Sequence, residues 1–176
     1  MDAKINSLKG GSVTLFAQHR YAKRQINNSV ERIKVAEDCE KIDSAGTYIK
    51  FGQLIEQKRK MLVDFLTNES TAGATIVGYG ASHSTTTLLH HFDLGNFLSY
   101  IVDDNERKHG LFSPGYGLRV FPSEAMIEEV PDYVVILAWQ HQETIIERNQ
   151  YLLDRGVRFV IPLPDIQIIG GGTHPS

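Results

Sequence analysis

The chain has 176 residues, of which 41% are hydrophobic and 22% charged, and its formal net charge at pH 7 is −3. These proportions are typical of a globular protein with one sizeable core. Nucleic acid is excluded as an expected partner, because proteins that bind the phosphate backbone present a basic surface. The single cysteine, Cys39, excludes an internal disulfide framework and a cysteine-rich zinc site, and it favours a reducing compartment.

No apolar run reaches the length of about 18 residues that a membrane-spanning helix requires. The start of the chain, residues 1–4, contains no apolar signal core. We therefore expect a cytoplasmic protein that does not bind membranes. The histidines, including the adjacent pair His90 and His91, are not spaced to converge on one ion, so no metal site is expected.

Residues 1–27 are predicted to form an N-terminal arm that contains one strand. The run 13–17 is rich in apolar and β-branched residues, which favours a strand, and the basic stretch 19–24 follows it. No partner strand is evident nearby, so we expect this strand to have belonged to a larger sheet.

Residues 28–72 are predicted to form a helical pair that packs on the domain after it. Asn28 and Glu31 have the spacing of a capping box, so the first helix is expected over 29–41. Apolar residues then recur at three- and four-residue steps, which predicts a second helix over 46–68.

Strands and helices alternate from residue 74 onward, which predicts an α/β fold. The expected strands are 74–79, 97–103, 118–121, 132–138 and 158–161, with an edge strand at 166–169, and the expected helices are 83–93, a short one after 122, and 141–155. We predict a Rossmann-like parallel sheet of about five strands with flanking helices. This domain spans 73–169, and the tail 170–176 is predicted to be disordered.

The first of these strands leads into a glycine-bearing turn and a helix start, which is where α/β folds bind anions. The candidate ligand-binding residues of the turn are Gly78, Tyr79, Gly80, Ala81, Ser82, His83, Ser84 and Thr85. His83 stands where the third glycine of a dinucleotide fingerprint is expected, which argues against tight NAD binding. The hydroxyl groups here either cap the helix or donate to a phosphate.

Four more candidate ligand-binding residues follow strands of the same sheet. Asp103 and Asp104 end the second strand, where carboxylates either accept from ribose hydroxyls or form a turn. Trp139 and His141 follow the fourth strand, where the indole either stacks on a base or packs on the sheet. The loop 105–117 is long for a compact domain, which indicates a function for it.

Several segments together carry a resemblance to a known family. They are Gly78-Tyr79-Gly80-Ala81, residues 100–105, residues 112–115, residues 131–139 and residues 158–164. In this order they resemble the C-terminal domain of the S-adenosylmethionine-dependent sugar C-methyltransferases, over about residues 10–169. Many members have a lysine-glycine pair after Gly-Tyr-Gly-Ala, whereas this chain has Ser82-His83-Ser84.

The resemblance implies a domain that holds a nucleotide-linked deoxyketosugar, such as a thymidine diphosphate sugar. It places the zinc-binding domain, the S-adenosylmethionine domain and the catalytic side chains outside this chain. We therefore expect no cofactor in the chain, no methyl transfer by the chain alone, and a partner that is either the rest of the same enzyme or a separate methyltransferase polypeptide. Two alternatives stay open: a stand-alone nucleotide or coenzyme A binding module, and an NAD-dependent oxidoreductase.

Overall fold

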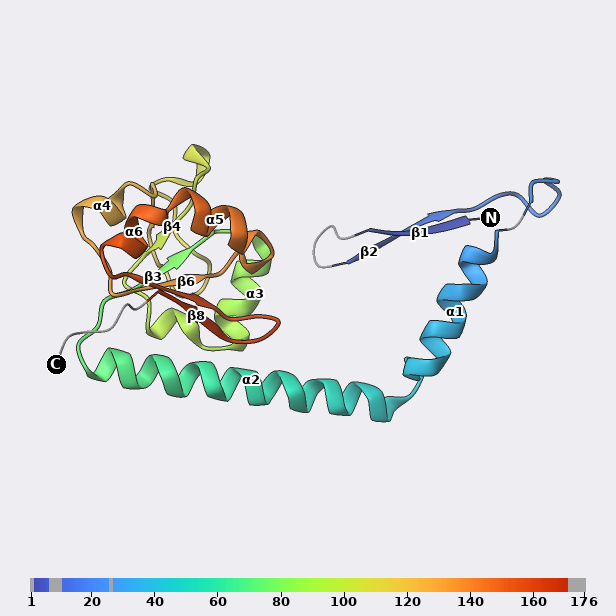
Figure 1. Ribbon diagram of the computed structural model, residues 1–176, viewed down its shortest axis with the longest axis horizontal. Coiled ribbons are helices and arrows are strands. Elements are labelled where there is room, and N and C mark those ends of the chain that lie inside the picture. The colour runs from blue at the N-terminus through green and yellow to red at the C-terminus, as the bar shows by residue number, and fades with distance from the viewer. Residues whose placement is uncertain (1, 7–10, 26, 171–176) are drawn as a thin grey trace. The chain divides into compact units, whose positions relative to one another are not determined.

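The computed structural model describes residues 2–6, 11–25 and 27–170 (Figure 1). The predicted disordered tail lies almost wholly outside these residues. The chain divides into two compact units, Met1–Ile55 (unit 1) and Glu56–Ser176 (unit 2), and each is described by itself. Among the described residues, no helix has the length and apolar character needed to cross a membrane.

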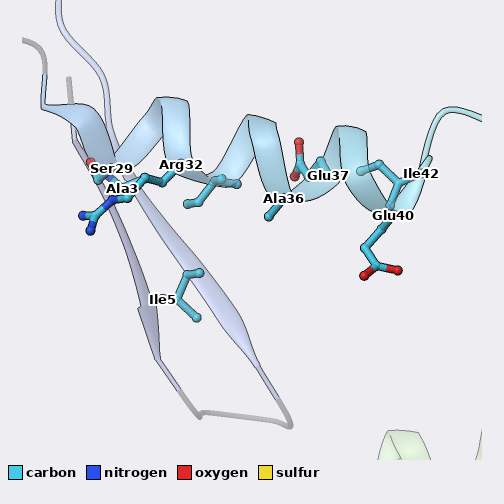
Figure 2. A pocket seen from close by; sticks show the side chains of 9 residues that line it. Ala3, Ile5, Ser29, Arg32, Ala36, Glu37, Glu40 and Ile42 are labelled. Atoms are coloured by element: carbon cyan, nitrogen blue, oxygen red, sulfur yellow. Dashed lines mark hydrogen bonds between the residues drawn. The ribbon is translucent and has the colours of Figure 1, made fainter.

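Unit 1 begins with a two-stranded antiparallel hairpin. Strand β1 (Asp2–Asn6) pairs with β2 (Ser12–Phe16), with Asp2 opposite Phe16. The expectation that the second strand has no neighbouring partner is therefore wrong, because residues 2–6 are too short and too polar to stand out as a strand in the sequence. Ser29 joins the hairpin to the following helix (Figure 2): its Oγ accepts from Ala3 N at 3.0 Å and donates to the Asp2 carboxylate at 2.6 Å.

Two helices follow the hairpin. Helix α1 (Asn28–Glu40) starts one residue earlier than predicted, and Asn27 takes the N-cap position without a side-chain hydrogen bond. The predicted capping box is thus wrong, because Asn28 already lies inside the helix. Lys41, with φ of 52°, ends α1 in the left-handed conformation. Helix α2 (Ala45–Thr71) begins in unit 1 and continues into unit 2.

Unit 2 contains a six-stranded sheet with the order β5-β4-β3-β6-β7-β8. The strands are β3 (Ile76–Tyr79), β4 (Ile101–Val102), β5 (Val120–Phe121), β6 (Tyr133–Ile136), β7 (Arg158–Ile161) and β8 (Gln167–Ile169). All neighbours are parallel except β7 and β8, which are antiparallel. The structure confirms the predicted α/β class and parallel sheet, and the edge strand expected over 166–169 is present as β8, which runs antiparallel to β7.

Helices cover both faces of this sheet. Figure 1 shows α4 (Ala125–Glu128), α5 (Gln142–Arg148) and α6 (Gln150–Asp154) on one side, and α3 (His83–His91) on the other. The first three contribute Met126, Ile145 and Leu152 to a buried cluster with alternate residues of the strands. The opposite face packs against α2, where the Phe65 ring contacts the Tyr133 ring edge-on.

Several elements are shorter than predicted. Strand β4 has two residues, because residues 97–100, expected as its first part, form irregular backbone after a 3-10 helix (Leu94–Asn96). Two further 3-10 helices are Glu106–Lys108 and Trp139–His141. The single helix expected over 141–155 is divided at Asn149, whose buried side chain donates to Ile145 O at 2.8 Å.

Candidate functional site

The glycine turn after β3 is closed tightly against the end of β6. Gly80 has φ of +103°, and a Cβ atom there would lie 2.6 Å from Ala138 Cβ and 3.1 Å from Ala138 N. Gly78 lies inside the strand, where a Cβ would come within 2.7 Å of Leu137 Cδ1. Both positions therefore require glycine for packing within the sheet, and the turn brings the start of α3 to the carboxyl edge of the strands.

Two of the hydroxyl groups at this helix start are used internally. Ser82 Oγ accepts from Thr85 N at 3.3 Å, which caps α3, and the buried Thr85 Oγ1 donates to Gly80 O at 2.8 Å. The backbone N–H groups of Ser82, His83 and Ser84 have no acceptor among the described residues. The structure therefore supports capping for Ser82 and Thr85 and leaves three amides free to donate to an anion.

Asp103 ties the glycine turn to the end of β4. Its carboxylate accepts from Ala81 N at 2.7 Å, Asn105 N at 2.9 Å and Lys108 Nζ at 2.9 Å, and the residue is 8% exposed. Burial raises the pKa of Asp103, but the hydrogen bond from Ala81 and those from Lys108 and Asn105 outweigh it, so that this pKa lies below its usual value. This carboxylate is ionised and holds the turn in place.

Asp104 belongs to a second network on the other side of the turn. The Tyr79 hydroxyl donates to the Asp104 carboxylate, which also pairs with Arg148 Nη1 at 3.3 Å. Burial and the hydrogen bond to Asp104 raise the pKa of Tyr79 to about 12. The side chain of Asp104 is 42% exposed, so this carboxylate keeps open positions for a ligand.

Two hollows of different character are lined by residues of the glycine turn. The first, of about 370 Å³, lies between the start of α3 and the loop after β4, and residues from both segments line it. These are Ala81, Ser82, His83, Thr85 and Thr86, with Leu89, Ile101, Lys108, Leu111, Phe112, Ser113, Pro114 and Val120. The second hollow, of about 270 Å³, is lined by Tyr79, Gly80, Asp103, Asp104, Ala138, His141, Thr144, Ile145 and Arg148.

The loop that walls the first hollow is fixed on the outer edge of β5. Gly110 N donates to Val120 O and Val120 N donates to Leu111 O, both at 2.8 Å, and Ser113 N donates to Leu118 O at 2.8 Å. Phe112 projects from this segment and is 64% exposed. The result is a fixed apolar wall with an exposed aromatic ring beside the free amides of α3.

The structure brings most of the predicted site residues to this edge. The first hollow is lined by residues 81–83 and Thr85, and the second by Gly80, Asp103, Asp104 and His141. Ser84 is exposed at the start of α3. Trp139 is half-buried against the core cluster and lines neither hollow, so its observed contacts are those of a packed residue. No three His, Cys, Asp or Glu side chains in the described parts of the chain group together as metal ligands.

Three side chains at the edge were not predicted from the sequence. Lys108 and Phe112 lie in the loop 105–117, whose length had indicated a function. Phe112 begins the segment 112–115 that carries the family resemblance, but neither residue was assigned to a ligand. Arg148 lies at the end of α5, and its pairing with Asp104 joins residues far apart in the chain. Only the arrangement of the sheet places it at the second hollow.

Comparison with known proteins identifies the family. Residues 7–164 match the family described as the C-methyltransferase C-terminal domain. C-methyltransferase NovU of Streptomyces niveus is 28% identical over 170 residues, which are 96% of this chain and 40% of the relative's length. UDP-D-quinovosamine 4-dehydrogenase from Vibrio fischeri is similar over 49% of this chain and 75% of its own, with 16% identity and a TM-score of 0.38. From the match over residues 7–164, the chain belongs to the C-methyltransferase C-terminal domain family.

Proposed function

We propose that unit 2 binds the nucleotide-linked sugar substrate of a C-methyltransferase, and that this chain alone transfers no methyl group. The observation that carries the proposal is the composition of the first hollow. Three free amides at the start of α3 form one side, and the apolar wall with Phe112 forms the other. A nucleoside diphosphate offers the matching groups, since it joins an anion to a flat aromatic base.

The two parts of such a ligand fit different sides of the hollow. The amides of residues 82–84 suit the diphosphate, and the positive end of the helix dipole adds to the attraction. The exposed ring of Phe112 suits a stacked base. The volume of about 370 Å³ lies within the usual range for small-molecule sites. Asp104, which is part-exposed, is the carboxylate available to a sugar hydroxyl.

The family implies S-adenosylmethionine as the methyl donor of the full enzyme. The start of α3 does not fit this donor, because its free amides and the positive end of the helix dipole favour an anion such as a diphosphate. S-adenosylmethionine has no phosphate and carries a sulfonium cation. We therefore assign the methyl donor to a region outside this chain.

Titration of the chain with thymidine diphosphate, and separately with S-adenosylmethionine, tests the proposal. We expect thymidine diphosphate to shift the amide resonances of residues 82–84, and S-adenosylmethionine to shift none of them. Phe112→Ala should weaken binding by about tenfold or more through lost stacking. The control Ile168→Ala, which truncates another exposed apolar side chain, on β8 and outside both hollows, should leave binding unchanged.

Three results would contradict the proposal. Binding of S-adenosylmethionine at the turn would identify the hollow as a donor site. Equal affinity for adenosine diphosphate, coenzyme A and thymidine diphosphate would favour a general nucleotide module. Methyl transfer to a thymidine diphosphate ketosugar by the purified chain would show that the catalytic residues lie within it.

A further inference from the structure

The wall of the first hollow ends in a tight turn at residues 113–117. Gly117 N donates to Ser113 O at 3.1 Å, and Tyr116 N donates to Pro114 O at 3.0 Å. Among the described residues, the backbone-to-backbone hydrogen bonds of 113–118 join these residues only to one another. Two strands paired by themselves are marginally stable, so the turn needs a further support to keep its place beside the hollow.

His90, near the end of α3, holds this turn through one hydrogen bond and two packing contacts. Its Nε2 lies 3.2 Å from Pro114 O, and because a carbonyl oxygen only accepts, Nε2 carries a hydrogen and donates it. The centroids of the His90 and Tyr116 rings are 4.9 Å apart, with 32° between their planes. At Gly115 a Cβ atom would lie 2.3 Å from His90 Cε1, so the imidazole rests directly against the backbone of the turn.

Tyr116 is held in turn by the 3-10 helix that follows α3. A Cβ atom on the buried Gly95 would lie 2.2 Å from Tyr116 Cγ, so the phenol ring covers this glycine. Burial raises the pKa of Tyr116, and the nearby Asp93 carboxylate adds to this rise. Arg59 Nη1 of α2 pairs with the same carboxylate at 3.2 Å. His90, Asp93 and Tyr116 together are called the clamp below.

We propose that His90 is a positioning residue for the nucleotide, because the clamp sets how far the wall with Phe112 stands from the amides of α3. Both sides of the hollow then belong to one frame, since α3 supplies the amides at its first residues and the clamp near its last. A diphosphate on these amides places its base at a set distance from α3, and stacking adds most to affinity when Phe112 is already held there. This inference rests on the proposed function.

The surroundings of His90 allow its role in binding to be separated from a role in stability. The side chain is exposed, so its removal opens no cavity in the core and should change the free energy of unfolding little. Its neighbour His91 is also exposed at the end of α3, but the His91 ring lies beside the Phe92 ring, with 5.8 Å between the centroids. His91→Ala is therefore a matched control for His90→Ala.

A double-mutant cycle with Phe112 tests the proposal. The affinity for thymidine diphosphate is measured in the wild type, His90→Ala, Phe112→Ala and the double variant. We expect His90→Ala to weaken binding by roughly threefold or more in the wild-type background and to have no further effect once Phe112 is replaced, because the clamp acts through that ring. His91→Ala should bind as the wild type does. An equal loss from His90→Ala in both backgrounds would overturn the proposal, since it would then arise in α3 itself.

Amide hydrogen exchange in the free chain distinguishes failure of the clamp from failure of the proposed function. The amides of Tyr116 and Gly117 donate within the turn, so His90→Ala should speed their exchange by roughly tenfold, and His91→Ala should leave it unchanged. Unchanged exchange in His90→Ala would refute the clamp even where thymidine diphosphate binds. Faster exchange in a chain whose wild type does not bind thymidine diphosphate would refute the proposed function, and with it the role of His90 in binding.

Discussion

Replacement of Gly80 by alanine tests how tightly the glycine turn is closed. The new Cβ would lie 2.6 Å from Ala138 Cβ and 3.1 Å from Ala138 N, so a backbone segment at the end of β6 must shift. A left-handed backbone costs an L-residue about 1–2 kcal/mol, and overpacking costs about 1–3 kcal/mol. We expect the free energy of unfolding of unit 2 to fall by about 3 kcal/mol. Urea denaturation followed by fluorescence of the single tryptophan, Trp139, measures this loss.

Gly73 offers a matched control for this experiment. Its φ is +89°, and a Cβ there meets no atom within 4 Å, so Gly73→Ala carries the backbone cost without the clash. We expect a loss of about 1 kcal/mol for this variant. Adding Ala138→Gly to Gly80→Ala should recover at least about 1 kcal/mol, because it removes the nearest contact. Equal losses for Gly80→Ala and Gly73→Ala would refute the argument that β6 limits the turn.

Three further predictions concern stability. Asp103→Asn should lower the free energy of unfolding at pH 7 by about 2 kcal/mol, since Lys108 loses its carboxylate. Folding lowers the pKa of Asp103, so its ionised carboxylate stabilises the fold above about pH 4, and this stabilisation is lost as the pH falls further. On acidification, the urea midpoint of Asp103→Asn should therefore fall less than that of the wild type. The pKa of Tyr79 is raised to about 12 in the folded chain, so its neutral hydroxyl stabilises the fold fully below about pH 10 and less at higher pH. Between about pH 10 and 12, Tyr79→Phe should therefore lose less stability than the wild type. Thermal unfolding should show a loss of about 2–5 kcal/mol for Leu62→Ala, which empties a fully buried site, and little change for its exposed neighbour Met61→Ala.

Local sequence signals were sufficient to predict the centre of the fold. The strand, the glycine turn and the helix start follow one another directly in the sequence, so each is marked by local residue preferences. The structure has β3, Gly80 and α3 at the predicted places. Strand β6 is buried on both faces, as its continuous apolar run predicts. The parallel order of the sheet follows from the alternation of strands and helices.

Features that depend on contacts between distant parts of the chain could not be predicted from local sequence. The apolar run before β4 predicted a longer strand, but Leu98 is buried in irregular backbone, which periodicity cannot distinguish from a strand. Trp139 was a candidate for stacking on a base or for packing on the sheet, and the sequence could not choose between them because its packing against the core depends on neighbours distant in the chain. The roles of Phe112 and Arg148 depend on which segments the sheet brings together.

The hydrogen bonds between residues 110–111 and Val120 have a consequence for the kinetics of ligand binding. They satisfy the outward N–H and C=O groups of β5, so the segment that carries Phe112 cannot swing away without exposing the edge of the sheet. The first hollow is therefore shaped before a ligand arrives, and no lid has to open for entry. Association should follow diffusion without a slow conformational phase, so that differences in affinity between related nucleotides arise in how fast they leave.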